Sequence, residues 1–128
     1  MNPLLWCLVV ITFLPFVLAM ASGVLRRKQF GVVDNKLPRL QQQQLVGIGA
    51  RALGAQQNAW EALTMFGPVV LIVQVADVDP IKAGLTGIVF VVMRVLHAIF
   101  YFADLDKLRS LSFVLGIACL IRLVVLAA

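Results

Sequence analysis

An unbroken apolar run near the start of the chain limits what this sequence can fold into. Residues 3–25 contain no charged side chain. As a helix rising about 1.5 Å per residue, this segment would be about 34 Å long, and the hydrocarbon core of a bilayer is about 30 Å thick. The apolar residues are continuous rather than alternating, which indicates a helix and not a barrel strand. The segment therefore predicts a membrane-spanning helix.

Three further apolar segments follow, at about residues 45–76, 81–103 and 108–128. The composition indicates the same class: 62% of the residues are hydrophobic, 13% are charged and the mean hydropathy is +0.99, whereas about 25% of a soluble domain is charged. We expect the first segment to be a permanent helix, because no Lys or Arg precedes it and it exceeds a signal-peptide apolar region. The sequence thus predicts an all-α protein, a single domain over residues 1–128 built as a membrane-spanning four-helix bundle.

The connections between the segments predict the orientation. Residues 26–44 carry five basic side chains and one acidic side chain. The positive-inside rule places this connection and residues 104–109 in the cytoplasm, with both termini outside it. This topology explains the basic excess, and no aromatic-interleaved basic patch indicates nucleic-acid binding. No metal site is predicted, because no Cys or His pair has ligand spacing. The brevity of the chain favours a bacterial inner (plasma) membrane.

Two of the apolar segments carry polar side chains at helical spacing, and the last segment begins with one. Spacings of three, four and seven residues place side chains on one face of a helix. An ionisable group inside a bilayer costs roughly 2.5–3.5 kcal/mol and persists where it faces a partner, a cavity or water. We therefore expect these side chains to share one site. They are Arg51, Asn58 and Glu61 in the second segment, Arg94, His97 and Tyr101 in the third, and Arg109 at the start of the fourth.

Two interpretations of this polar set are open. In the first, it forms a cationic pocket for a small anion that also carries an amine or amide for Glu61 and Asn58. In the second, it is an internal network, in which Glu61 pairs with Arg51 or Arg94, and His97 and Tyr101 satisfy each other. The whole set favours the pocket, because the arginines at this level outnumber the single glutamate.

The same residues resemble the signature of a known family. The segment RALGAQQNAWE (51–61) is similar to the pattern Arg-Ala-x-x-Ala-x-x-Asn-x-x-Glu of the MAPEG family, the membrane-associated proteins in eicosanoid and glutathione metabolism. The segment RVLHAIFY (94–101), followed by Arg109-Ser110, resembles the prostaglandin synthase branch. The resemblance covers essentially the whole chain and indicates a bacterial-type member. It implies a homotrimer of left-handed four-helix bundles, with the cosubstrate glutathione bound between subunits near the cytoplasmic face.

The resemblance also implies roles for individual residues. Arg109 is expected to hold the glutathione thiolate and so to be catalytic, and Glu61 is expected to face the free amine. Relatives usually have an arginine four positions before Asn58, where this chain has Gly54, and we expect Arg51 to reach into the space that Gly54 leaves. The other expected glutathione-binding residues are Arg51, Gln56, Asn58, Arg94, His97, Tyr101 and Arg27.

The resemblance therefore implies a glutathione-dependent enzyme of the transferase or peroxidase type, acting on small hydrophobic electrophiles that enter from the membrane lipid. An adjacent guanidinium lowers the pKa of a thiol from about 8.5, so activation requires no general base. One alternative is a non-catalytic relative that binds a lipid or an anionic metabolite, which Gly54 favours. The other is a small proton-coupled exporter, which we rank last because exporters of this kind carry their glutamate on the first helix.

Overall fold

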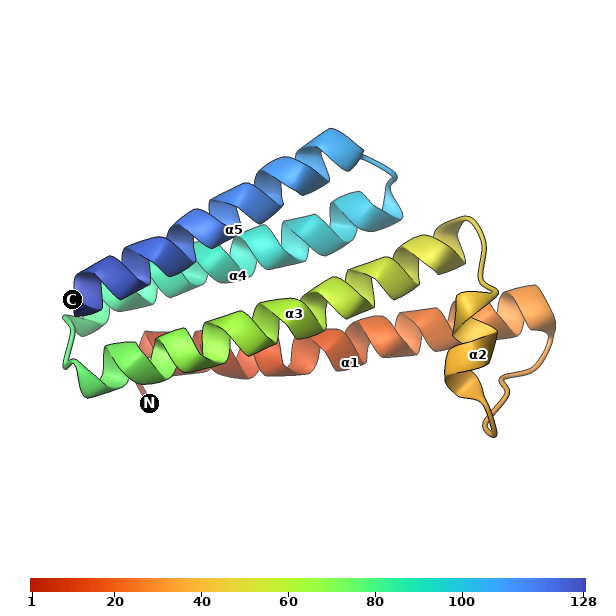
Figure 1. The fold of residues 1–128 in the computed structure, drawn as a ribbon, viewed down its shortest axis with the longest axis horizontal. Coiled ribbons are helices and arrows are strands. Elements are labelled where there is room, and N and C mark those ends of the chain that lie inside the picture. Colours follow the sequence, from red (N-terminus) through yellow and green to blue (C-terminus); the bar gives the residue numbers. More distant parts are fainter.

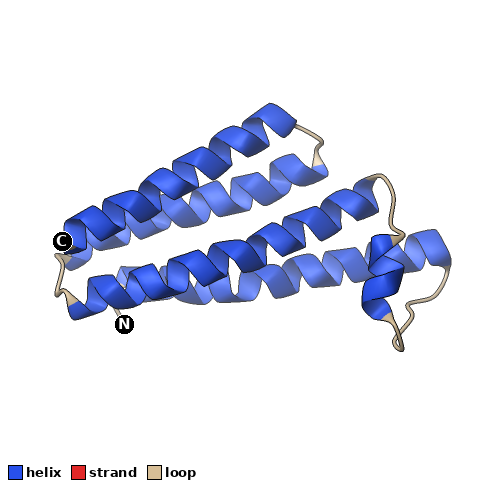
Figure 2. Cartoon of the chain, viewed as in Figure 1, coloured by secondary structure: helices blue, strands red, loops and turns tan.

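The computed structural model describes all 128 residues, and the chain consists of helices joined by turns and loops (Figure 2). Four long helices, α1 (Pro3–Phe30), α3 (Ile48–Val75), α4 (Pro80–Phe102) and α5 (Asp106–Ala127), run along one bundle. The short helix α2 (Pro38–Gln43) lies at the end opposite the two termini (Figure 1). Helix α1 packs against α3 and α4, and α5 packs against α4 and α3. The predicted all-α, four-helix fold is confirmed.

The four long helices are all long and apolar enough to cross a membrane. Their outer faces expose large apolar side chains along their whole length, and lipid chains solvate such surfaces at no cost. Examples are Trp6 and Phe13 on α1, Leu71 on α3, Ile99 on α4 and Val125 on α5. The chain is therefore a multi-pass integral membrane protein.

Helix α1 begins and ends at residues suited to those positions. The side-chain oxygen of Asn2 accepts a hydrogen bond from the backbone N–H of Leu5 at 3.0 Å, and Pro3 occupies the first turn, where its missing N–H costs nothing. The helix ends at Gly31, whose φ of +78° is the left-handed conformation that glycine adopts readily. Basic residues in the last turn interact favourably with the negative end of the helix dipole. This interaction stabilises the part of α1 that extends beyond the apolar run.

The second spanning helix begins later than the expected position near Leu45. Gly47 has a φ of +56° and separates α2 from α3, which starts at Ile48. Gln41 anchors α2 to the preceding connection: its amide accepts from the backbone N–H of Asp34 at 3.0 Å and donates to the carbonyl of Val32 at 2.8 Å. The connection therefore folds back over the end of the bundle as a separate short helix.

The apolar core is not evenly distributed along the bundle. In its middle, Phe66 of α3 and Phe90 of α4 are buried and stack with ring centroids 4.4 Å apart. Towards the α2 end, the buried apolar side chains are mostly small, with Ala55, Ala59 and Ala98 facing Leu18. Small side chains leave room between the helices, and two polar residues of α4 are buried in this half. They are Arg94 and His97.

Candidate functional site

A chain of hydrogen bonds joins α4 to α3 in the α2 half of the bundle. Arg94 of α4 is 3% exposed, and its guanidinium donates to Oδ1 of Asn58 on α3. The amide nitrogen of Asn58 donates in turn to Oε2 of Glu61 at 3.1 Å. Asn58 thus links a buried cation to a carboxylate that is exposed on the surface of the single chain. The internal-network interpretation is right that Arg94 and Glu61 are connected, but the connection runs through an amide.

Tyr101, in the last turn of α4, lies directly against the backbone of α3 at Gly54. A Cβ atom at Gly54 would be 2.6 Å from the hydroxyl oxygen of Tyr101 and 2.7 Å from the nearest carbon of its ring. The guanidinium of Arg109, in the first turn of α5, lies over the same ring with its Cζ 4.4 Å from the centroid, which is a cation–π contact. The expectation that Arg51 fills the space left by Gly54 is wrong, because Tyr101 fills it.

Arg51 instead faces the turn between α4 and α5. Its Nη1 lies 3.9 Å from Oδ2 of Asp104. Asp104 has a φ of +59°, a left-handed conformation that aspartate tolerates better than most residues. The carboxylate is 74% exposed, so this ion pair adds little to stability. Sequence analysis missed Asp104 as a partner, because a residue in a turn shares no helical spacing with the polar stripes.

His97 is 4% exposed and packs between aromatic rings. Its ring centroid lies 5.5 Å from that of Tyr101, in an edge-on contact, and 6.3 Å from that of Phe113 on α5. Phe113 also lies beneath Arg94, whose Cζ is 5.9 Å from its centroid. Phe113 is a second residue that sequence analysis missed, since a phenylalanine in an apolar helix carries no sign that it faces a polar cluster. Aromatic rings therefore contact both Arg94 and His97.

Two of the predicted binding residues lie away from this cluster within one chain. Gln56 occupies another face of α3, where its Oε1 is buried without a hydrogen-bond partner. It lines a polar cavity of about 390 Å³ between α3 and α2, together with Arg39, Gln42 and Trp60. Arg27, near the end of α1, lines a separate cavity of about 300 Å³. The structure thus joins six of the nine predicted residues in one network of contacts, to which Phe113 also belongs: Asn58, Glu61, Arg94, His97, Tyr101 and Arg109. Arg51 lies on the same helix as Asn58 and pairs with Asp104.

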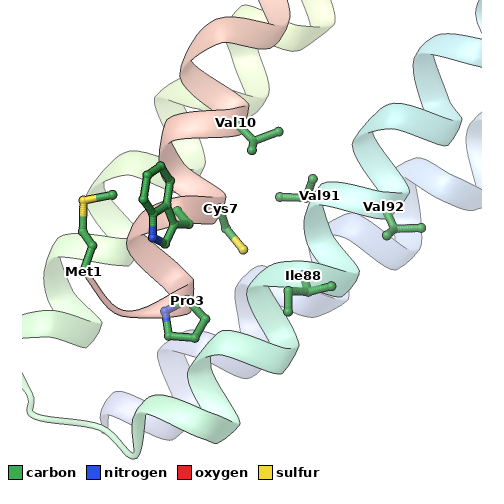
Figure 3. Close-up of a pocket in the computed structure, with 8 residues that line it drawn as sticks. Met1, Pro3, Cys7, Val10, Ile88, Val91 and Val92 are labelled. Carbon is green, nitrogen blue, oxygen red and sulfur yellow. The ribbon is translucent and has the colours of Figure 1, made fainter.

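A cavity of about 410 Å³ lies in the other half of the bundle, between α1 and α4 (Figure 3). It is open to the surface, and its lining is almost entirely apolar, with Cys7 and Val10 on α1 facing Val91 on α4. No side chain of this cavity carries a charge, so the cavity suits an apolar molecule better than an anion. The candidate site is therefore the polar cluster of α3, α4 and α5.

The sequence model of the MAPEG family matches residues 4–128, so the matched region includes all of the polar cluster. No curated protein matches the sequence.

Proposed function

Because this chain belongs to the MAPEG family, we propose that it is a glutathione-dependent membrane enzyme of the transferase or peroxidase type. The family contains such enzymes as well as non-catalytic members. The observation that carries the proposal is the convergence of polar groups from three helices. The linked Arg94, Asn58 and Glu61 are connected to the stacked Tyr101 and Arg109 through the rings of Phe113 and His97. Small hydrophobic electrophiles dissolved in the bilayer are the expected substrates, since the helices around the cluster are exposed to lipid.

The charges of the cluster suit glutathione, which carries two carboxylates, a free amine and a thiol. The Nε atoms of Arg51 and Arg94 are buried and have no hydrogen-bond partner in the chain. A buried donor without a partner costs about 1–3 kcal/mol, so a carboxylate that accepts from these groups would recover that energy. The exposed carboxylate of Glu61 is available to an amine. Asn58, His97 and Tyr101 would add contacts along the peptide.

Arg109 is the group that we assign to activation of the thiol. Glutathione supplies the nucleophile when bound, and its thiol, with a pKa of about 8.5 in water, is mostly protonated at neutral pH. A guanidinium beside the sulfur stabilises the ionised form and so lowers this pKa. A guanidinium is a permanent cation in proteins, so activation by Arg109 needs no general base. No nucleophilic residue of the chain itself is required.

We further propose that the enzyme is a homotrimer in a bacterial inner membrane, with the site at the cytoplasmic face and both termini outside. The connection with five basic residues lies at the α2 end of the bundle (Figure 1), the same end as the cluster. A trimer would also give a role to Gln56 and Arg27. These two residues lie away from the cluster of their own chain, and from there they could contact glutathione held by a neighbouring subunit.

The proposal is tested on the purified protein in detergent. Glutathione is added and the ultraviolet absorbance of its thiolate is followed, and a chloronitrobenzene is then added as electrophile. Thiolate formation followed by turnover supports the enzyme. S-methylglutathione, which has no ionisable thiol, is the control and should bind without the absorbance change. Binding of glutathione without turnover would replace the enzyme with a non-catalytic binding protein, and absence of binding would reject the proposal.

Substitution of Arg51 tests whether it belongs to the glutathione site. We expect Arg51→Ala to weaken glutathione binding by roughly tenfold or more, because a hydrogen bond to a charged group contributes about 1.5–3 kcal/mol. Turnover at saturating glutathione should not change, since this contact is the same in the ground state and the transition state. Asp104→Asn is the matched control, because it removes the ion pair of Arg51 but keeps the guanidinium. Equal dissociation constants for Arg51→Ala and the unaltered protein would remove Arg51 from the site.

A further inference from the structure

We propose that Gly54 is a positioning residue for Arg109, acting through the ring of Tyr101. The inference rests on the proposed function, in which Arg109 lies beside the thiol. A glycine has no side chain that could contact a ligand. In this proposal, Gly54 nevertheless sets the position of the reactive guanidinium.

The glycine at position 54 needs an explanation. Glycine inside a helix is less stable than alanine by roughly 0.5–1 kcal/mol, and Gly54 lies inside α3 with an ordinary helical φ. Backbone conformation therefore does not require it. The limited space beside α3 does require a glycine, because a Cβ atom at position 54 would lie only 2.6–2.8 Å from the hydroxyl oxygen and ring carbons of Tyr101. Gly67, on the same helix, differs in this respect, because a Cβ atom there would meet nothing within 4 Å.

The ring that rests on Gly54 is also the contact that holds Arg109. The side chain of Arg109 forms no ion pair and no hydrogen bond with the rest of the chain, and its guanidinium lies over the ring of Tyr101. His97 supports the ring from another direction through its edge-on contact. The position of the guanidinium is therefore set by the position of the ring, and the ring can lie where it does only because residue 54 has no side chain.

A methyl group at position 54 should move the ring and, with it, the guanidinium. Relief of the contact requires a shift of several tenths of an ångström, since ordinary carbon contacts begin at about 3.5 Å. A misplacement of about 1 Å at a reacting group can lower a rate on the order of 100-fold. We expect Gly54→Ala to lower turnover at neutral pH by roughly tenfold. The apparent pKa of bound glutathione should rise, because the displaced guanidinium stabilises the thiolate less.

The experiment compares Gly54→Ala with Gly67→Ala. Both changes add a methyl group to α3. The methyl group at position 54 meets the ring of Tyr101, whereas the one at position 67 meets no side chain apart from its chain neighbours, which include Pro68. Because the chain has one tyrosine, isotope-labelled tyrosine gives a single set of ring resonances that reports Tyr101 in protein without glutathione. We expect these resonances to shift in Gly54→Ala and not in Gly67→Ala. The pH profile of thiolate absorbance is the second measurement, and it should move to higher pH in Gly54→Ala alone, with turnover recovering at high pH.

A second pair of variants covers the case in which Gly54→Ala does not fold. Tyr101→Ala removes the ring, and it should raise the apparent pKa of bound glutathione in the same way. In the Tyr101→Ala background, Gly54→Ala should have no further effect, because the partner of the methyl group is gone. The inference would be overturned if Gly54→Ala and Tyr101→Ala raised the apparent pKa of bound glutathione independently of each other. Identical ring resonances and pH profiles in Gly54→Ala and Gly67→Ala would also overturn it. Either result would leave the proposed function standing, because that function is tested by glutathione binding, thiolate formation and turnover in the unaltered protein.

Discussion

Arg109→Ala should abolish most turnover while leaving the peptide part of glutathione bound. The guanidinium is the cation that we place beside the sulfur. When an enzyme loses one group that stabilises negative charge at the reacting atoms, the rate falls roughly 100- to 1000-fold. Without it, the thiol should return towards its pKa in water of about 8.5 and remain protonated at neutral pH. The absorbance of the thiolate should therefore vanish at neutral pH and reappear as the pH rises above that value.

Two measurements separate this role from a general loss of structure. The affinity of Arg109→Ala for S-methylglutathione should stay within a few-fold of the unaltered protein, because the other polar groups remain. Arg122→Ala is the matched control, since Arg122 is an exposed arginine on the same helix, nearer the chain terminus. It should retain thiolate formation and turnover. An Arg109→Ala protein that still forms thiolate at neutral pH would show that another group activates the thiol.

Asn58→Ala should lower both stability and glutathione binding, because Asn58 holds two charged groups at once. The change removes the acceptor of Arg94, which is 3% exposed, and the donor to Glu61. A buried charge left without its hydrogen-bond partner costs about 3–5 kcal/mol when the pair is fully enclosed, and less where water or a ligand can reach it. We expect a clear fall in the thermal unfolding midpoint in detergent, and weaker glutathione binding as Glu61 loses its support.

Gln57→Ala is the control for this change, since Gln57 is the preceding residue of α3 and its side chain is exposed. Its unfolding midpoint should equal that of the unaltered protein. Asn58→Asp adds a second test, because a carboxylate keeps an acceptor for Arg94 but loses the amide donor to Glu61. Asn58→Asp should recover part of the unfolding midpoint that Asn58→Ala loses, but it should not recover the affinity for glutathione. If Asn58→Ala and Gln57→Ala unfold at the same temperature, the link between Arg94 and Glu61 contributes nothing to the fold.

Hydropathy was sufficient to predict the four spanning helices. The helices end at positions different from the ends of the apolar runs, and the local backbone conformation explains these differences. The length of an apolar run is a property of one segment, so it can be read without knowing the neighbours of that segment. The ends depend on backbone conformation at Gly31 and Gly47, both with positive φ. The spacing of Arg51, Asn58 and Glu61 likewise predicted a shared face, because helical geometry alone places side chains around an axis.

Spacing could not predict which residues of different helices touch. The choice of Tyr101, rather than Arg51, as the occupant of the space beside Gly54 depends on how closely α4 approaches α3. The separation of Gln56 from Asn58 follows from helical geometry, but the cavity that Gln56 lines depends on where α2 folds back. The pairing of Arg51 with Asp104 depends on the turn that ends α4.

The sequence alone therefore determined that the chain crosses the membrane four times, and that polar faces of three helices lie in the same half of the bundle. Only the tertiary structure decided the contacts within that half, namely the Asn58 link and the stack of Gly54, Tyr101 and Arg109. The physical reason is that periodicity describes the direction of a side chain around its own helix. Contacts between helices also require their separation and rotation, which the packing of all of them sets together.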